Sequence, residues 1–281
     1  MIFGRVKPLD AILATAEKKS LHRTLGWFQL MLFGIGCVIG TGIFVLTAAG
    51  AQEAGPGLML AFAIAGAVCI IAALCYAEIA SMIPVAGSAY TYSYASVGEF
   101  LAWTVGWALI MEYAIAAAAV SVGWSGYFSG TFLNEILGVQ LPAWLAAGPL
   151  VLGGAPGGLI NLPALIIALL VTGLLVVGTS ESAKVNAVLV LIKVTALTAF
   201  IALTFTSPSF DASHFNPFLP AGVFGGFGSG LGAVGAAATI FFAYVGFDAV
   251  STAAEETKNP QKNVPIGLVG SLLFCTVFYI L

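Results

Sequence analysis

The amino-acid sequence consists mainly of uncharged apolar runs that are long enough to cross a membrane. Hydrophobic residues make up 60% of the 281 residues and charged residues only 7%, whereas about a quarter of the residues in a soluble domain are charged. A hydrocarbon core of about 30 Å is crossed by about 20 apolar helical residues. We therefore predict an all-α integral membrane protein with seven spans: Trp27–Ala49, Gly57–Pro84, Phe100–Gly123 with an extension to Phe132, Leu162–Val177, Val185–Thr206, Val234–Thr252 and Ile266–Leu281.

The basic residues outside these spans all fall on one side of the predicted membrane. Five precede the first span, and Lys184, Lys258 and Lys262 lie in loops that share that side. The loops on the other side, 50–56, 124–161 and 207–233, contain no lysine or arginine. Because cytoplasmic loops are enriched in lysine and arginine, we predict a multi-pass protein of the cytoplasmic (plasma) membrane with its N-terminus in the cytoplasm. The net charge of −3 argues against a nucleic-acid partner.

The regions outside the first six spans give three expectations about the organisation of the chain. Residues 1–26 carry Leu9, Ile12, Leu13 and Ala16 at helical spacing, which predicts an amphipathic helix on the cytoplasmic interface; a solvated polar tail is the alternative. Turn residues, among them Thr179–Ser182 and Glu255–Pro265, separate the spans. The last run stops at Leu281 after 16 residues without a polar flank, which predicts a truncated piece of a longer transporter-like chain.

Two charged residues are predicted to lie deep inside spans. Lys193 is the one basic residue within a membrane-length run, and Glu112 lies in the middle of the third run. A charge at the centre of a membrane helix costs on the order of 2.5–3.5 kcal/mol on insertion scales, so each is a candidate functional residue. Lys193 snorkelling to the membrane surface is the alternative. Glu112 either faces a substrate side chain or pairs with another polar group.

Glycines interrupt the first and the sixth spans. The first contains Gly34, Gly36, Gly40 and Gly42 within nine residues, and the sixth contains Gly246 followed by Asp248. A broken helix exposes backbone amides at the start of one half and carbonyls at the end of the other, which bind an anion and a cation. Two such spans, five apart, are expected of an inverted-repeat transporter.

Purely structural interpretations of these residues remain open. The pair Gly36 and Gly40 fits a helix-packing face, and Asp248 could serve only as a helix cap. A dinucleotide-binding loop is rejected because no strand precedes the glycines.

Three segments resemble the cationic amino acid transporter family of the amino acid–polyamine–organocation (APC) superfamily. They are Gly34–Val45 (GIGCVIGTGIFV), Tyr76–Tyr92 (YAEIASMIPVAGSAYTY) and Phe242–Pro260 (FAYVGFDAVSTAAEETKNP). The resemblance implies a LeuT-like five-plus-five inverted-repeat fold with broken helices 1 and 6, truncated here to about seven transmembrane helices. Residues 27–206 then form the first repeat and residues 207–281 the start of the second.

The resemblance also implies roles for individual residues. The substrate carboxylate meets the backbone amides around Thr41 and Gly42, and the α-ammonium meets carbonyls of Val38, Phe242, Ala243 and Val245. Lys193 matches the lysine that sodium-independent members carry in the fifth span, which implies proton coupling. Glu112 and Asp248 are candidates for the side-chain pocket.

The expected function is secondary active transport of amino acids. Its expected partners are an amino-acid substrate, protons and membrane lipid. Among amino acids, the transporter is expected to favour cationic ones. In this hypothesis Lys193 alternates between charged and neutral forms as the site opens to each side. An uncoupled facilitator or exchanger, and a non-transporting membrane sensor, are the alternatives. An enzyme is not expected, because no nucleophile–base pair is evident, and neither a cofactor nor a metal is expected, because Cys37, Cys69, Cys75 and Cys275 lack zinc-site spacing.

Overall fold

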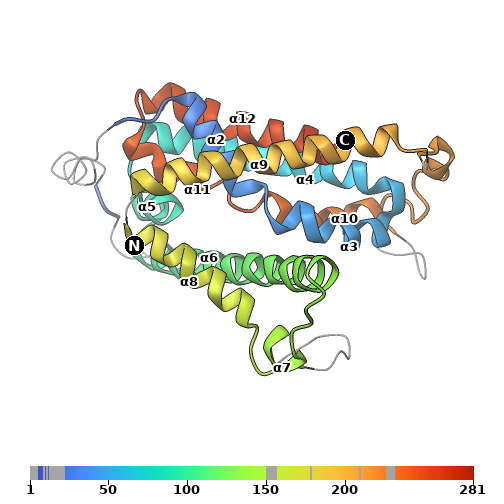
Figure 1. Cartoon of the computed structure of the whole chain (residues 1–281). Helices are drawn as coiled ribbons and strands as arrows, with labels where there is room; N and C mark the ends of the chain where they lie inside the picture. Colours follow the sequence, from blue (N-terminus) through green and yellow to red (C-terminus); the bar gives the residue numbers. More distant parts are fainter. Residues whose placement is uncertain are drawn as a thin grey trace. The chain divides into compact units, whose positions relative to one another are not determined.

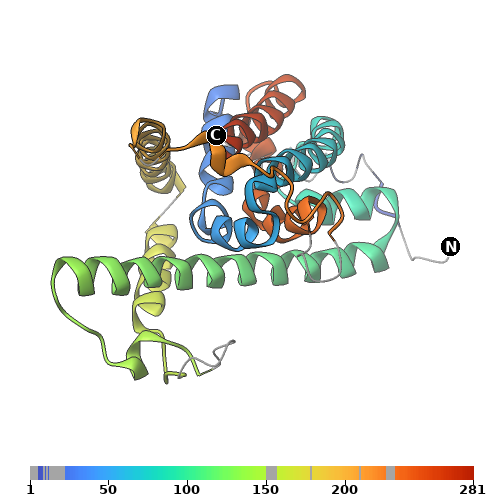
Figure 2. The ribbon, with the colours of Figure 1, turned by 90° about the vertical axis from the view of Figure 1, so that its right-hand side faces the viewer.

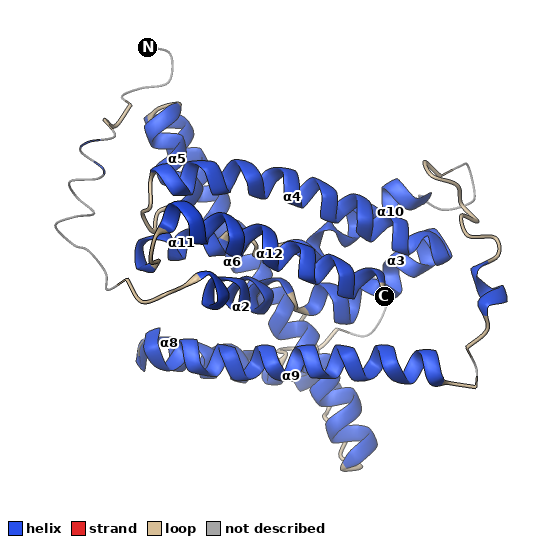
Figure 3. Cartoon of the chain, turned by 90° about the horizontal axis from the view of Figure 1, so that it is seen from above, coloured by secondary structure: helices blue, strands red, loops and turns tan. Residues whose placement is uncertain are grey.

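The computed structural model describes residues 6–8, 10, 12, 23–149, 157–177, 179–208, 210–225 and 232–281. Within this part of the chain every regular element is a helix, as Figure 3 shows by colour. The chain divides into two compact units, one formed by residues 1–109 and 186–281 and the other by residues 110–185. Most of the predicted N-terminal amphipathic helix lies outside the described residues.

The first unit contains the two interrupted helices and the two long helices that pack on them (Figure 1). Its elements are α2 (Trp27–Val38), η1 (Gly42–Leu46), α3 (Thr47–Ala54), η2 (Gly55–Gly57), α4 (Leu58–Met82), α5 (Ser88–Ser96), the start of α6 (Glu99–Tyr127), most of α9 (Thr179–Thr206), η4 (Ala212–Phe215), α10 (Gly232–Ile240), η5 (Phe241–Tyr244), α11 (Ala249–Thr252), η6 (Ala253–Glu256) and α12 (Pro260–Ile280).

Small residues allow the helices of this unit to approach closely. Helix α12 packs against α2 and α4, and α10 packs against α3 and α4; Figure 2 shows these elements gathered in one bundle. One face of α4 is a buried row of small side chains, Ala61, Ala65, Cys69, Ala73, Ala77 and Ala80. Gly267 of α12 faces Leu30 of α2, and a side chain there would collide with it. Small residues at such contacts are typical of membrane helices, which associate through close packing.

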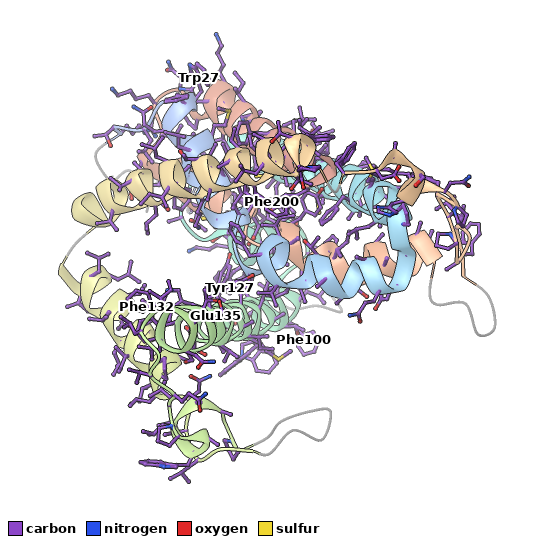
Figure 4. All side chains as sticks on the ribbon, turned by 45° about the vertical axis from the view of Figure 1, so that its right-hand side comes forward. Trp27, Phe100, Tyr127, Phe132, Glu135 and Phe200 are labelled. Carbon is purple, nitrogen blue, oxygen red and sulfur yellow. The ribbon has the colours of Figure 1, made fainter. Side chains whose placement is uncertain are left out.

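The second unit comprises the rest of α6, the π-helical segment η3 (Phe128–Ile136), α7 (Ala143–Ala146), α8 (Leu162–Val177) and the first turns of α9. The Asn161 side chain donates to the Ser125 hydroxyl at 2.8 Å and accepts from the Ala164 amide at 3.1 Å, which links α6 to the start of α8. Trp124, Phe128 and Phe132 stack along one side of this unit, and Figure 4 labels Phe132. Most apolar side chains of α6 and α8 are exposed, as lipid-facing residues are.

The described helices agree with a multi-pass membrane protein, although their lengths differ from the predicted spans. Five helical stretches are long and apolar enough to cross a membrane, and α2 and α8 are shorter apolar helices. Residues 42–82 form one such stretch because α3 passes through the short helical turn η2 directly into α4. The break after Val38 leaves α2 with only 12 residues.

Two predicted turns are wrong in part, because helices extend into them, although residues 257–259 of the second lie outside the helices. Helix α9 begins at Thr179, inside the turn predicted for Thr179–Ser182. Helix α12 begins at Pro260 and includes Pro265, inside the segment predicted as a loop up to Pro265. Pro260 occupies the first position of α12, where proline is well tolerated because its missing amide has no acceptor to lose. The polar sequence around it therefore did not distinguish a helix start from a loop.

We expect Gly246→Ala to destabilise the protein. Gly246 has a φ angle of 105°, and an added Cβ would lie 3.0 Å from the Cys37 carbonyl oxygen. A non-glycine residue in such a conformation costs about 1–3 kcal/mol. Thermal unfolding in detergent measures the loss. Gly126→Ala in α6, where nothing lies within 4 Å of the added Cβ, is the matched control; an equal loss in both variants would contradict this explanation.

Candidate functional site

Helix α2 ends in the middle of the first apolar run and leaves its last carbonyls without helical partners. The backbone turns extended at Ile39 (φ −73°, ψ 100°), and helical structure resumes by Gly42. The last carbonyls of any helix lack intrahelical donors and carry the negative end of the helix dipole. In an apolar surrounding, these groups must be satisfied by side chains or by a ligand.

The Lys193 ammonium satisfies part of this carbonyl end. Its Nζ donates to the Gly36 carbonyl at 3.0 Å and to the Ile39 carbonyl at 2.7 Å. Both acceptors belong to the end of α2, so the side chain joins α9 to the first break. The charge is favourable here because cations are stabilised at the C-terminal end of a helix. These contacts contradict the alternative in which Lys193 snorkels away from the helix bundle.

The sixth apolar run is broken in the same way. Helix α10 continues through η5 to Tyr244, the chain turns at Val245 (φ −59°, ψ 137°), and α11 begins at Ala249. Gly246 takes the positive φ angle that this turn requires. The glycine-rich and Gly-Phe-Asp segments identified in the sequence are therefore the places where the two helices are interrupted.

The two breaks lie against one another. A Cβ on Gly42 would collide with the Cα atom of Ala243, and Gly246 lies against the carbonyl of Cys37. Only glycine allows backbones to approach this closely. The residues predicted to bind the substrate, Thr41 and Gly42 on one side and Val38, Phe242, Ala243 and Val245 on the other, are brought together in the first unit by these contacts.

The Tyr279 hydroxyl bridges the carbonyl ends of both broken helices. It lies 3.0 Å from the Val38 oxygen and 3.1 Å from the Ala243 oxygen. Two of the four predicted ammonium-binding carbonyls therefore point at one buried oxygen atom. A third, Phe242, accepts from the Val245 amide at 3.2 Å. A carbonyl oxygen has two lone pairs and can accept a second donor.

The amide side of the site contains a buried hydroxyl with no partner. Thr41 Oγ1 is fully covered and makes no hydrogen bond to any residue that the structure describes. It lies directly before η1, where the first backbone amides also have no intrahelical acceptor. A buried polar atom of this kind is costly unless something hydrogen-bonds to it.

The two acidic candidates belong to different units of the chain. Asp248 is 5% exposed and occupies the position before α11, yet its side chain makes no capping hydrogen bond, so the alternative that it serves only as a cap is wrong. Glu112 is on α6 in the second unit, whereas the breaks belong to the first. Both side chains make further interactions within the described structure.

Sequence reasoning missed Tyr279 and Tyr244. The Tyr244 hydroxyl donates to the Phe62 carbonyl of α4 at 3.0 Å. A signal was available, because a tyrosine inside an apolar run needs a partner for its hydroxyl. Which group each tyrosine hydroxyl contacts depends on how α12 and α4 pack, and this packing could not be predicted from the sequence.

Comparison with known proteins identifies the same class of molecule. The family model described as amino acid permease matches residues 29–281. The chain is 50% identical to the branched-chain amino acid permease BcaP of Bacillus subtilis (strain 168), with 99% of this chain and 57% of that protein covered. It is 46% identical to the methylthioribose transporter of the same organism (98% and 57% covered). It is 41% identical to the chloroplastic cationic amino acid transporter 9 of Arabidopsis thaliana (93% and 44% covered).

The chain thus spans about half the length of these curated relatives. The family match runs from residue 29, in the first turn of α2, through α12 to residue 281, and it includes both helix breaks. On this match, and on the interrupted helices that it covers, the chain belongs to the amino acid permease family of the APC superfamily.

Proposed function

We propose that the protein is part of a permease that binds an α-amino acid between its two helix breaks and carries it across the membrane. The observation that carries this proposal is the meeting of the breaks, with Gly42 against Ala243. Amides and the unpartnered Thr41 hydroxyl lie at the start of one half-helix. The carbonyls of Val38 and Ala243 converge on the other side. The first set suits a carboxylate and the second an ammonium.

The same proposal extends to the architecture. We propose a LeuT-like inverted-repeat fold in which residues 27–206 form the first repeat, residues 207–281 begin the second, and the N-terminus is cytoplasmic. Seven membrane crossings follow if α2 with α3, and α10 with α11, each count as one interrupted span. The protein then resides in the cytoplasmic membrane and acts as a transporter, with no enzymatic step.

Proton coupling is proposed to operate through Lys193. Its charged form donates to Gly36 and Ile39 and so holds the end of α2 against α9. A neutral amine would keep a weaker version of the same contacts, because hydrogen bonds from a charged donor are about twice as strong. Loss of the proton would therefore loosen α2, which carries one wall of the proposed site.

We propose that the site accepts amino acids with a range of side chains. Its backbone groups recognise the α-carboxylate and α-ammonium that all amino acids share. The relatives are named for branched-chain amino acids, cationic amino acids and methylthioribose. Asp248, close to the second break, supports a cationic preference. Methylthioribose has neither an α-ammonium nor an α-carboxylate. A protein that transports methylthioribose would therefore need a different binding mode, and this is the alternative to the proposed site.

A ligand screen on the purified full-length protein tests the proposed site. We expect α-amino acids to raise the unfolding temperature, because a ligand at 100 times its Kd stabilises a protein by about 2.7 kcal/mol. The amino-acid amides and the decarboxylated amines serve as matched controls that lack the carboxylate, and should have no effect. A shift with methylthioribose and with no amino acid would contradict the proposal.

Lys193→Ala should abolish accumulation driven by a pH gradient in reconstituted vesicles, while exchange of internal for external substrate continues. Lys193→Arg keeps the charge but does not release its proton, and it should also lose coupling. Radiolabelled uptake with and without the gradient measures this. Full gradient-driven accumulation by both variants would contradict coupling through Lys193 and leave the lysine a structural role, whereas uptake by the unmodified protein that ignores the gradient would favour an uncoupled facilitator.

Tyr279→Phe should weaken amino-acid binding by about fivefold, because one net hydrogen bond of about 1 kcal/mol no longer holds the two carbonyls together. Tyr244→Phe is the matched control. It removes a buried hydroxyl from the same unit, yet that hydroxyl donates to Phe62 and not to the site. Calorimetric titration of both variants compares the affinities; equal weakening in the two would assign Tyr279 a general structural role.

A further inference from the structure

Three basic residues gather where α2 and α12 begin. The Leu25 amide donates to the Glu256 carbonyl at 3.0 Å, and the Lys258 amide donates to the Leu25 carbonyl at 2.8 Å. These bonds hold the segment before α2 parallel to the segment before α12. Arg23 and Lys258 are therefore kept close together, although they are far apart in the chain. Lys262, in the first turn of α12, completes the group, which we call the basic cluster.

The basic cluster carries more positive charge than the adjacent carboxylates neutralise. Its three side chains are exposed, and none pairs with a carboxylate among the residues that the structure describes. The neighbouring η6 supplies two negative charges, Glu255 and Glu256. The Glu255 carboxylate already accepts from the Ala86 amide, between α4 and α5, at 3.2 Å. The segment therefore holds three positive charges against two negative ones, of which one is engaged elsewhere.

The position of Lys262 does not favour the helix that carries it. In the first turn of α12, the helix dipole opposes a positive charge. Arg23 and Lys258 lie outside the helices, where the backbone bonds bring their like charges together. Like charges repel one another. A bound anion would offset both unfavourable effects.

An aromatic pair lies on the membrane side of the basic cluster. Trp27, labelled in Figure 4, and Phe28 begin α2, and their rings meet edge to face with centroids 5.7 Å apart. Gly267 of α12 packs against Leu30 of α2, which sets the register of the two helices. At a rise of 1.5 Å per residue, Trp27 lies about 4.5 Å and Lys262 about 7.5 Å before that contact. The aromatic pair is thus nearer to the membrane centre, and tryptophan is enriched at the level of lipid headgroups.

An exposed apolar stripe continues from Lys262 along α12. Ile266, Leu273 and Val277 follow at intervals of four, seven and four residues, which places these side chains on one face of the helix. The three apolar side chains are between 41% and 55% exposed. Other residues of α12 are buried, and the helix packs against α2 and α4. A phospholipid presents groups in the matching order, a charged headgroup followed by hydrocarbon chains.

We propose that the basic cluster, the aromatic pair and the apolar stripe form a binding site for one anionic phospholipid. Its phosphate lies at Arg23, Lys258 and Lys262, and an acyl chain lies along the stripe. The orientation proposed above places the site in the cytoplasmic leaflet, where basic residues next to a membrane helix attract anionic lipids. A soluble phosphate ester would contact the basic cluster alone, so the stripe that continues from it favours a lipid.

Removal of charge tests the headgroup contacts. Full-length protein in a neutral detergent is titrated with phosphatidylglycerol, and native mass spectrometry counts the bound lipids. Lys262→Gln should weaken binding of the first lipid about fivefold, and a triple variant that also carries Arg23→Gln and Lys258→Gln about a hundredfold, from the attraction that each basic residue adds. Exposed charges of this kind can be removed with little effect on stability.

Lys7→Gln is the matched control for these variants. Lys7 is also exposed and basic, but its amide donates to the Tyr94 carbonyl of α5 at 3.3 Å, so it belongs to a different segment. Its substitution should leave lipid binding unchanged. Binding by the triple variant as tight as that of the unmodified protein, or equal weakening by Lys7→Gln and Lys262→Gln, would overturn the proposal.

Labelling from the acyl chain tests the apolar stripe. Phosphatidylglycerol with a photoreactive acyl chain is added to the full-length protein in phosphatidylcholine vesicles, and peptide mapping locates the adducts. We expect adducts at Ile266, Leu273 or Val277 that unlabelled phosphatidylglycerol prevents, and that the triple variant does not form. Prevention by glycerol phosphate would assign the basic cluster to a soluble anion. Absence of adducts on α12 would show that another part of the full-length protein covers the stripe. Either result would overturn the proposal, and neither depends on which substrate is transported.

Discussion

The C-terminal end of α2, whose last carbonyls have no donors within the helix, is the constraint on which the rest of the first unit depends. A helix that stops in an apolar medium leaves carbonyl oxygens that water cannot satisfy. Here they are met by the Lys193 ammonium from α9 and the Tyr279 hydroxyl from α12. The break is therefore hydrogen-bonded to two other helices, α9 and α12, and these bonds restrict where both can pack. The second break takes part because Tyr279 also contacts the Ala243 carbonyl.

The same break explains why small residues are placed as they are. Gly42 and Gly246 permit backbone contact between the two interrupted spans, and Gly34 allows Ser271 and Val250 to approach α2. The small-residue face of α4 brings α12 close enough for its tyrosine to reach the carbonyls. Packing and polar satisfaction are therefore linked: without the close packing, the hydroxyl of Tyr279 would not reach its acceptors.

Several of these features could be predicted from the sequence because each has a local signature. The apolar runs indicate membrane helices, the clustered glycines mark the place where the first span breaks, and a lysine within an apolar run indicates a polar partner nearby. The partners could not be predicted, because they come from residues far away in the chain: Lys193 meets Gly36, and Glu53 meets Thr239. The early starts of α9 and α12 were missed for a different reason, since polar residues and a first-turn proline favour a helix end and a loop about equally.

The central claim is that the two breaks form one binding site for an α-amino acid. An experimental structure of the full-length protein with the most strongly stabilising amino acid tests it most directly. The account predicts the ligand carboxylate at the Thr41 and Gly42 amides and its ammonium at the Val38 and Ala243 carbonyls. A ligand bound elsewhere, or bound at the breaks with its carboxylate directed at the carbonyls, would contradict it.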